Sequence, residues 1–136
     1  MNNGFNKHIL FSLSIIIYDK IFNMETGKLF RLAEDVDYSK DAVVSRTIIK
    51  KSTGTVTLFA FDAGQGLSPH VAPFDALVQI LDGECSFSIE ETKHLMGQGD
   101  CIILPAGKIH AVEALKPFKM LLTMIKIVEG TMRMAD

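Results

Sequence analysis

The sequence lacks tryptophan and has only two cysteines, Cys85 and Cys101. Two cysteines that do not follow the C-x-x-C spacing exclude a disulfide framework, so we expect a reduced, cytoplasmic protein. The chain also lacks an excess of charge, because 14 Lys and Arg residues stand against 16 Asp and Glu residues, without a basic cluster. Nucleic-acid binding needs a surface that contacts phosphates, and we therefore expect no nucleic-acid partner.

Long hydrophobic runs are also missing. The only candidate, residues 9–17, contains Ser12 and Ser14 and is much shorter than the ~20 residues of a membrane-spanning helix, so we expect no membrane association. No small-x-small cleavage site follows it, which disfavours a signal peptide. Residues 1–24 are then interpreted as an extension that is poorly ordered or precedes a true start at Met24. An added strand or helix that covers a sheet edge or a partner subunit is the alternative.

The rest of the chain, residues 25–136, is predicted to be one domain with a barrel core over about residues 42–128. In the polar segment before the first predicted strand, the apolar residues expected to anchor the chain are Leu29, Phe30 and Leu32. Short runs rich in β-branched and aromatic residues then predict strands. These runs are residues 42–49, 55–61, 75–81, 84–90, 94–96, 101–104, 109–115 and 118–128. Because Asp82-Gly83 separates two of them, a hairpin is expected there. The pattern predicts an all-β sandwich or barrel.

Two stretches between residues 64 and 114 each place one histidine among glycine and proline. The spaced residues are Gly64, His70 and Gly83 in the first stretch and Gly99, Pro105, Gly107 and His110 in the second. These spacings resemble the two signature motifs of the cupin family, which are small double-sheet β-barrels of the jelly-roll type. The resemblance covers roughly residues 54–128 and implies a double-stranded β-helix.

The sequence departs from the cupin motifs at three positions. The complete motifs bind a divalent metal through three histidines and one glutamate, and the resemblance carries two of these ligands over to His70 and His110. Ala72 and Ala76 stand at the other two ligand positions, and Ala114 replaces a motif asparagine. Two imidazoles make a weak site, because zinc, iron and manganese normally take three or more protein ligands. We therefore expect no tightly bound metal, with a divalent metal on His70 and His110 as the alternative.

The two histidines are predicted to face a pocket inside the barrel. Side chains alternate between the two faces of an extended strand, so residues at even spacing from each histidine share its face. Cys85 is added because Cys85, Phe87 and Ile89 alternate on the predicted inner face, and it is also the first candidate for a third metal ligand. The predicted lining residues are His70, Ala72, Phe74, Ala76, Cys85, His110, Val112 and Ala114.

Three functions agree with this pattern, and no catalytic residue can be assigned. The first is a metal-independent module that binds a small, partly apolar organic molecule. The second is a metal-dependent enzyme of the cupin type, such as an isomerase, decarboxylase or oxygenase, with a non-standard ligand set. The third is a structural or interaction module whose pocket is vestigial. The last run, 118–128, is apolar on both faces, which places it inside a sheet or between subunits. Since cupins are frequently dimeric, we expect a homodimer.

Overall fold

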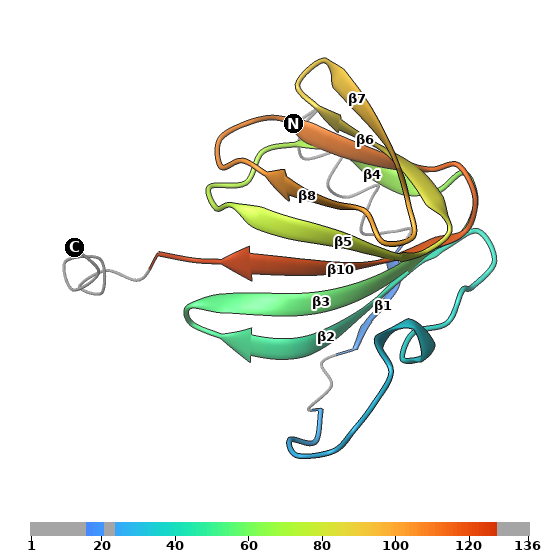
Figure 1. Ribbon diagram of the computed structural model, residues 1–136, viewed down its shortest axis with the longest axis vertical. Helices are drawn as coiled ribbons and strands as arrows, with labels where there is room; N and C mark the ends of the chain where they lie inside the picture. The colour runs from blue at the N-terminus through green and yellow to red at the C-terminus, as the bar shows by residue number, and fades with distance from the viewer. Residues whose placement is uncertain (1–15, 21–23, 128–136) are drawn as a thin grey trace.

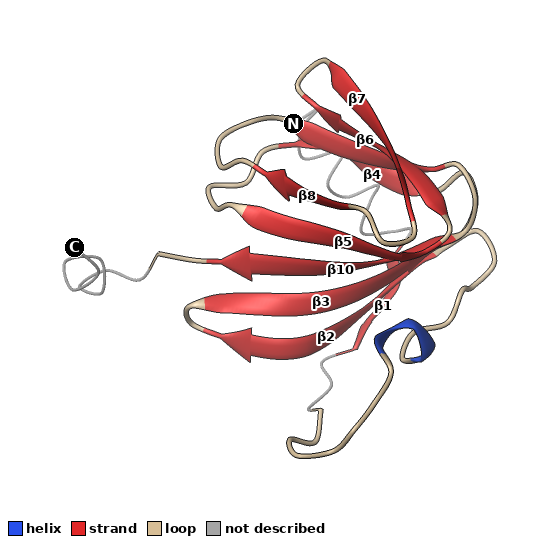
Figure 2. Cartoon of the chain, viewed as in Figure 1, coloured by secondary structure: helices blue, strands red, loops and turns tan. Residues whose placement is uncertain are grey.

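The computed structural model describes residues 16–20 and 24–127, and within them the chain is almost entirely β. The strands are β1 (Ile16–Lys20), β2 (Val43–Lys51), β3 (Gly54–Phe61), β4 (Gly66–His70), β5 (Ala76–Asp82), β6 (Glu84–Ile89), β7 (Thr92–Gly97), β8 (Cys101–Leu104), β9 (His110–Ala114) and β10 (Phe118–Ile125). One short 3-10 helix, η1 (Leu32–Glu34), precedes β2. Figure 2 shows how little of the described chain is helical. The all-β prediction is confirmed.

The strands form two sheets that face each other. One sheet has the order β1-β2-β3-β10-β5-β8 and the other the order β4-β9-β6-β7. Figure 1 shows the four-stranded sheet above the six-stranded one, with β10 in the middle of the latter. Neighbouring strands are antiparallel except for β1, which runs parallel to β2. This arrangement is the double-stranded β-helix that the cupin resemblance implied.

All eight predicted runs coincide with strands, with ends that differ by a few residues, whereas β4 was missed and β1 was only one alternative for the N-terminal extension. β4 contains Pro69, which cannot donate a backbone hydrogen bond and is tolerated because β4 is an edge strand. The hairpin prediction at Asp82-Gly83 was wrong. β5 pairs with β10 and β8, while β6 pairs with β7 and β9, so the chain passes from one sheet to the other at this dipeptide.

The main core lies between the sheets. Inward-facing residues of both sheets build it, and Phe61 stacks on Phe118 with ring centroids 4.5 Å apart and an interplanar angle of 10°. Both rings are fully buried. A stacked aromatic pair of this kind contributes about 0.5–1.5 kcal/mol beyond the burial of its area. The barrel interior is therefore tightly packed around Phe61 and Phe118.

A second apolar cluster lies on the outer face of the six-stranded sheet. Leu58, Ala60 and Leu121 are covered there by Val36 and Leu32 of the segment before β2. The prediction that Leu29 anchors this segment was wrong, because Leu29 is 92% exposed. The cluster explains part of the apolar character of β10: one face points into the barrel, and on the other face Leu121 is covered by the chain itself. Ile125, at the end of the same outer face, is 71% exposed.

The described part of the predicted extension forms an added edge strand. β1 pairs with β2 through registers such as Ile16 with Val43 and Lys20 with Arg46. This is the alternative that the sequence offered for an N-terminal element at a sheet edge. The rest of that extension, residues 1–15 and 21–23, lies outside the described residues. Across the described chain, no helix combines the length and the hydrophobicity needed to cross a bilayer.

Candidate functional site

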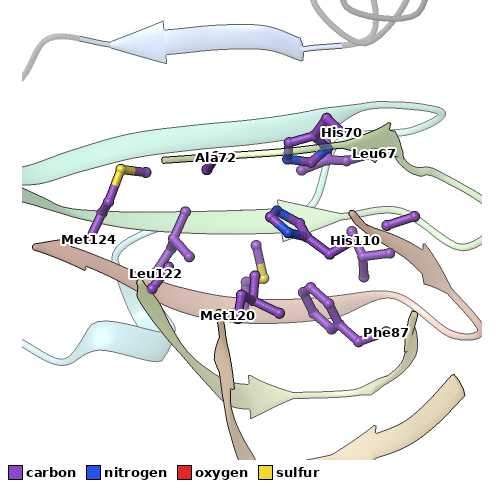
Figure 3. A pocket seen from close by; sticks show the side chains of 12 residues that line it. Leu67, His70, Ala72, Phe87, His110, Met120, Leu122 and Met124 are labelled. Carbon is purple, nitrogen blue, oxygen red and sulfur yellow. The ribbon is translucent and has the colours of Figure 1, made fainter. Parts of the chain in front are cut away.

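A cavity of about 160 Å³ lies between the two sheets, beside the packed core. Its lining residues come from β4, β5, β6, β8, β9 and β10 and from the loop after β4. They are Leu67, His70, Ala72, Ala76, Phe87, Leu104, His110, Ala111, Val112, Met120, Leu122 and Met124. Among these side chains, only His70 and His110 are polar. Figure 3 shows their imidazole rings next to each other, facing the row of Met120, Leu122 and Met124 on β10.

The two histidines are brought together by strand pairing. His70 ends β4, His110 begins β9, and the two residues are direct partners in the antiparallel ladder. Their ring centroids lie 4.4 Å apart with an interplanar angle of 71°. Residues opposite each other in such a ladder have Cβ atoms about 5 Å apart, which is why the rings touch.

Backbone carbonyl groups set the tautomer of both rings. Nδ1 of His70 lies 2.7 Å from the carbonyl oxygen of Ser68, and Nδ1 of His110 lies 3.2 Å from that of Lys108. A carbonyl oxygen only accepts hydrogen bonds, so Nδ1 carries the proton in each ring. In the neutral imidazole Nε2 is then an acceptor. Each of these two lining residues therefore keeps one acceptor nitrogen, Nε2.

Burial favours the neutral form of His110. Its pKa is lowered, first by desolvation and then by the neighbouring His70, while the hydrogen bond to Lys108 opposes the shift. Charging one imidazole beside another in an apolar cavity is unfavourable, because burial and a like charge nearby both disfavour the charged form. At neutral pH His110 thus acts as an acceptor and not as a cation.

The loop after His70 differs from the predicted continuous strand. The chain leaves the four-stranded sheet at His70, bends at residues 73–74, and enters the six-stranded sheet at Ala76. Ala72 and Ala76 still reach the cavity, but from the loop and from the opposite sheet. Phe74 does not line it, so that prediction was wrong. Its ring lies 6.0 Å from Nζ of Lys126 instead.

Cys85 and Ala114 also lie outside the cavity, which corrects two further predictions. They are direct partners in the ladder between β6 and β9 and are buried in the main core. Ala114 is four residues beyond His110, roughly 13 Å along an extended strand. In the ladder, Phe87 and Val112 lie between Cys85 and Ala114 on one side and His110 on the other, so they separate Cys85 and Ala114 from the cavity. Burial raises the pKa of the Cys85 thiol to about 12, so the free thiol is protonated at neutral pH.

Seven lining residues lie outside the predicted set of pocket residues. These are Leu67, Phe87, Leu104, Ala111, Met120, Leu122 and Met124. The alternation on β10 places Met120, Leu122 and Met124 on one face, but only the sheet order shows that this face points at the histidines. Leu67 lies on the missed strand β4.

The donor atoms around the cavity do not match those of the cupin metal site. The four ligand positions of the family fall at His70, Ala72, Ala76 and His110, and all four line the cavity. Two of them carry only a methyl group. Within the described residues no group of three or more His, Cys, Asp or Glu side chains is placed to hold a metal ion. The nearby Asp75 instead accepts a hydrogen bond of 2.8 Å from the backbone N–H of Ala106. Two imidazoles remain as protein ligands.

Comparison with known proteins agrees with this architecture. The family model of the AraC-like ligand binding domain matches residues 53–132. A conserved protein of unknown function from Streptococcus pyogenes has a similar structure, with 33% sequence identity and a TM-score of 0.74, over 82% of this chain and 98% of that chain. A search of curated proteins gives no significant match.

Two further solved structures are similar. A cupin 2 conserved barrel domain protein from Leptotrichia buccalis is 40% identical with a TM-score of 0.69, over 71% of this chain and 47% of that chain. A cupin superfamily protein from Desulfitobacterium hafniense is 26% identical with a TM-score of 0.73, over 79% of this chain and 99% of that chain. With its two facing sheets, its two motif histidines in one cavity and these matches, the chain belongs to the cupin superfamily, and its barrel matches the AraC-like ligand binding domain.

Proposed function

We propose that this protein is a binding module that takes up a small organic molecule in the barrel cavity without a tightly bound metal. One observation carries the proposal: His70 and His110, each with Nε2 as an acceptor, are the only polar side chains among the residues that line an otherwise apolar cavity. The match to a ligand-binding domain family supports it.

The hydrogen bonds of the two imidazoles support a binding role. Nδ1 of each ring is engaged by a backbone carbonyl group, which leaves Nε2 as an acceptor for a ligand that carries hydrogen-bond donors. A barrel that served only as a structural support would not need a polar side chain at either position.

A metal-dependent cupin enzyme is the second candidate, because His70 and His110 occupy two of the ligand positions of the family motif. Such an enzyme would need a third donor from the substrate or from solvent. We favour the first candidate because Ala72 and Ala76, which occupy the remaining ligand positions, line the same cavity without a donor atom.

Elemental analysis of protein purified without a chelator or a histidine tag separates the two candidates. We expect no stoichiometric metal in the wild type, and binding of small metabolites detected as a rise in melting temperature. His70→Ala and His110→Ala should weaken that binding. His94→Ala, in a histidine on β7 outside the cavity, is the matched control. A stoichiometric metal that disappears in both cavity variants, but not in the control, would support the enzyme instead.

We also propose a homodimer that forms through the outer face of the six-stranded sheet. Ile103 on β8 and Ile125 on β10 are 62% and 71% exposed, and Leu77 and Thr123 lie between them on the same face. The segment with Leu32 and Val36 covers a different part of this face. Sedimentation of the wild type should show a dimer that Ile103→Lys dissociates, and a monomer at all concentrations would rule this interface out.

A further inference from the structure

The lining of the cavity limits how many polar groups a ligand can carry. Among the described lining residues, only two side chains can form hydrogen bonds, and they lie side by side. Every further hydroxyl or amide group of a ligand would lose its hydration against apolar side chains, which lowers affinity by about 5- to 150-fold per group. A saturated sugar with hydroxyl groups all round its ring is therefore disfavoured. The ligand should have one polar edge and an otherwise apolar body.

The charge of the lining points to a neutral ligand. None of the described lining residues is Lys, Arg, Asp or Glu, so a bound carboxylate or ammonium group would have no opposite charge beside it. Neutral His110 also does not supply a positive charge. Burying an unpaired charge is much more costly than burying a neutral hydroxyl group.

The number of acceptor atoms sets the number of donors that the ligand needs. A hydroxyl group carries one proton and donates to one Nε2 atom, so two hydroxyl groups are needed to serve both rings. The ring centroids of His70 and His110 lie only 4.4 Å apart, so the two hydroxyl groups should be close neighbours on the ligand.

The size and the side chains of the cavity favour an aromatic body. An apolar cavity of about 150 Å³ holds one benzene molecule, and the volume here is about 160 Å³. Met120 and Met124 line the wall that faces the histidines, and Phe87 lies at its end (Figure 3). Methionine sulfur makes favourable contacts with aromatic rings, and phenylalanine packs against them in offset or edge-on arrangements.

We infer that the ligand is a neutral benzene ring with two adjacent hydroxyl groups, one donating to Nε2 of His70 and the other to Nε2 of His110. This inference rests on the proposed binding function and gives it a ligand class. The ring would lie against Met120, Leu122 and Phe87, and its hydroxyl groups would face the edge of the cavity formed by β4 and β9.

Titration calorimetry on the full chain with three probes tests the ligand class. The probes are catechol (1,2-dihydroxybenzene), resorcinol (1,3-dihydroxybenzene) and phenol, all measured without oxygen and with a chelator so that no trace metal mediates binding. Catechol should bind at least about fivefold more tightly than either other probe, because one additional hydrogen bond contributes about a factor of five. This ranking in the wild type requires no variant to fold.

Two variants assign the preference to the histidines. In His70→Leu and in His110→Leu, catechol should lose its advantage and bind no better than phenol, because one acceptor remains and the second hydroxyl group has no partner. His94→Leu is the matched control and should keep the wild-type ranking. Equal affinity for the three probes in the wild type would overturn the diol inference and leave the binding function intact. Binding of none of them would also overturn it, and the binding function would then be judged by the metabolite screen alone.

Discussion

Gly83 provides a sharp test of how the chain crosses between the two sheets. It lies between β5 and β6 with φ of +80°, in the left-handed region that favours glycine. A Cβ atom at this position would overlap the carbonyl oxygen of Pro117 and would lie 2.7 Å from Cα of Phe118. We predict that Gly83→Ala destabilises the protein strongly, because both neighbours are backbone atoms that cannot rotate away.

Gly64 is the matched control for this substitution. Its φ is +82°, but a Cβ atom there would meet nothing within 4 Å. Gly64→Ala should therefore cost only the left-handed backbone penalty of about 1–2 kcal/mol. Gly83→Ala includes the same penalty and in addition forces the chain at Phe118 to move, where the side chain stacks on Phe61. We expect a total loss above about 4 kcal/mol, which is exceptional for a single substitution.

Urea unfolding of the wild type and both variants, followed by far-UV circular dichroism, measures the two free energies of unfolding. At a similar m-value, the midpoint of Gly83→Ala should fall much further than that of Gly64→Ala, with a difference of more than about 2 kcal/mol. If the two variants lose the same stability within about 0.5 kcal/mol, the close approach of Gly83 to residues 117–118 is not a constraint on the fold and the reasoning fails.

Three further predictions concern the core and the cavity. Phe118→Ala should lower the free energy of unfolding by about 3–5 kcal/mol, whereas truncation of the exposed Leu95 to Ala should change it by less than about 0.5 kcal/mol; chemical denaturation compares them. The pKa of His110 is lowered in the folded state, so as the pH falls through about 6.5 the imidazole of His110 is protonated in the unfolded chain before it is protonated in the folded one. The free energy of unfolding should therefore decrease from neutral pH downward. Denaturation at several pH values should show a smaller decrease in His110→Leu than in the wild type, and an unchanged decrease would contradict the shift. Finally, Ala72→His combined with Ala76→Glu should create a zinc site with the two native histidines, and calorimetry should show at least about 100-fold tighter zinc binding than in the wild type.

The positions of the strands were predictable from sequence because they depend on short stretches of the chain, in which apolar residues alternate and turn residues mark the ends. The motif spacing around His70 and His110 also predicted the fold family, and both histidines do line one cavity. Phe74 could not be placed in this way, because the alternation rule holds only while the chain stays in one strand, and the chain leaves its strand after His70. Cys85 and Ala114 have the predicted inward orientation, but they lie too far along their strands to reach the cavity.

The residues opposite the histidines were predicted only as core or pocket lining on one face of the last strand, without their position in the barrel. Met120, Leu122 and Met124 follow a clear alternation, but the neighbours of a strand across the barrel depend on the order of the strands in both sheets. The hairpin expected at Asp82-Gly83 failed in the same way, since the dipeptide signals a sharp turn and does not say which strands it joins.

The position of β4 at the edge of its sheet has a consequence for how the cavity opens. β4 pairs only with β9, its register shifts between Leu67 and His70, and Pro69 contributes no N–H group to the ladder. Local separation of this one strand breaks few hydrogen bonds and costs much less free energy than global unfolding. Backbone amide hydrogens of β4 should therefore exchange with solvent sooner than those of β10, which is held on both sides. A molecule that contacts His70 from within would slow that exchange, so hydrogen exchange at β4 can report occupancy of the cavity before the occupant has been identified.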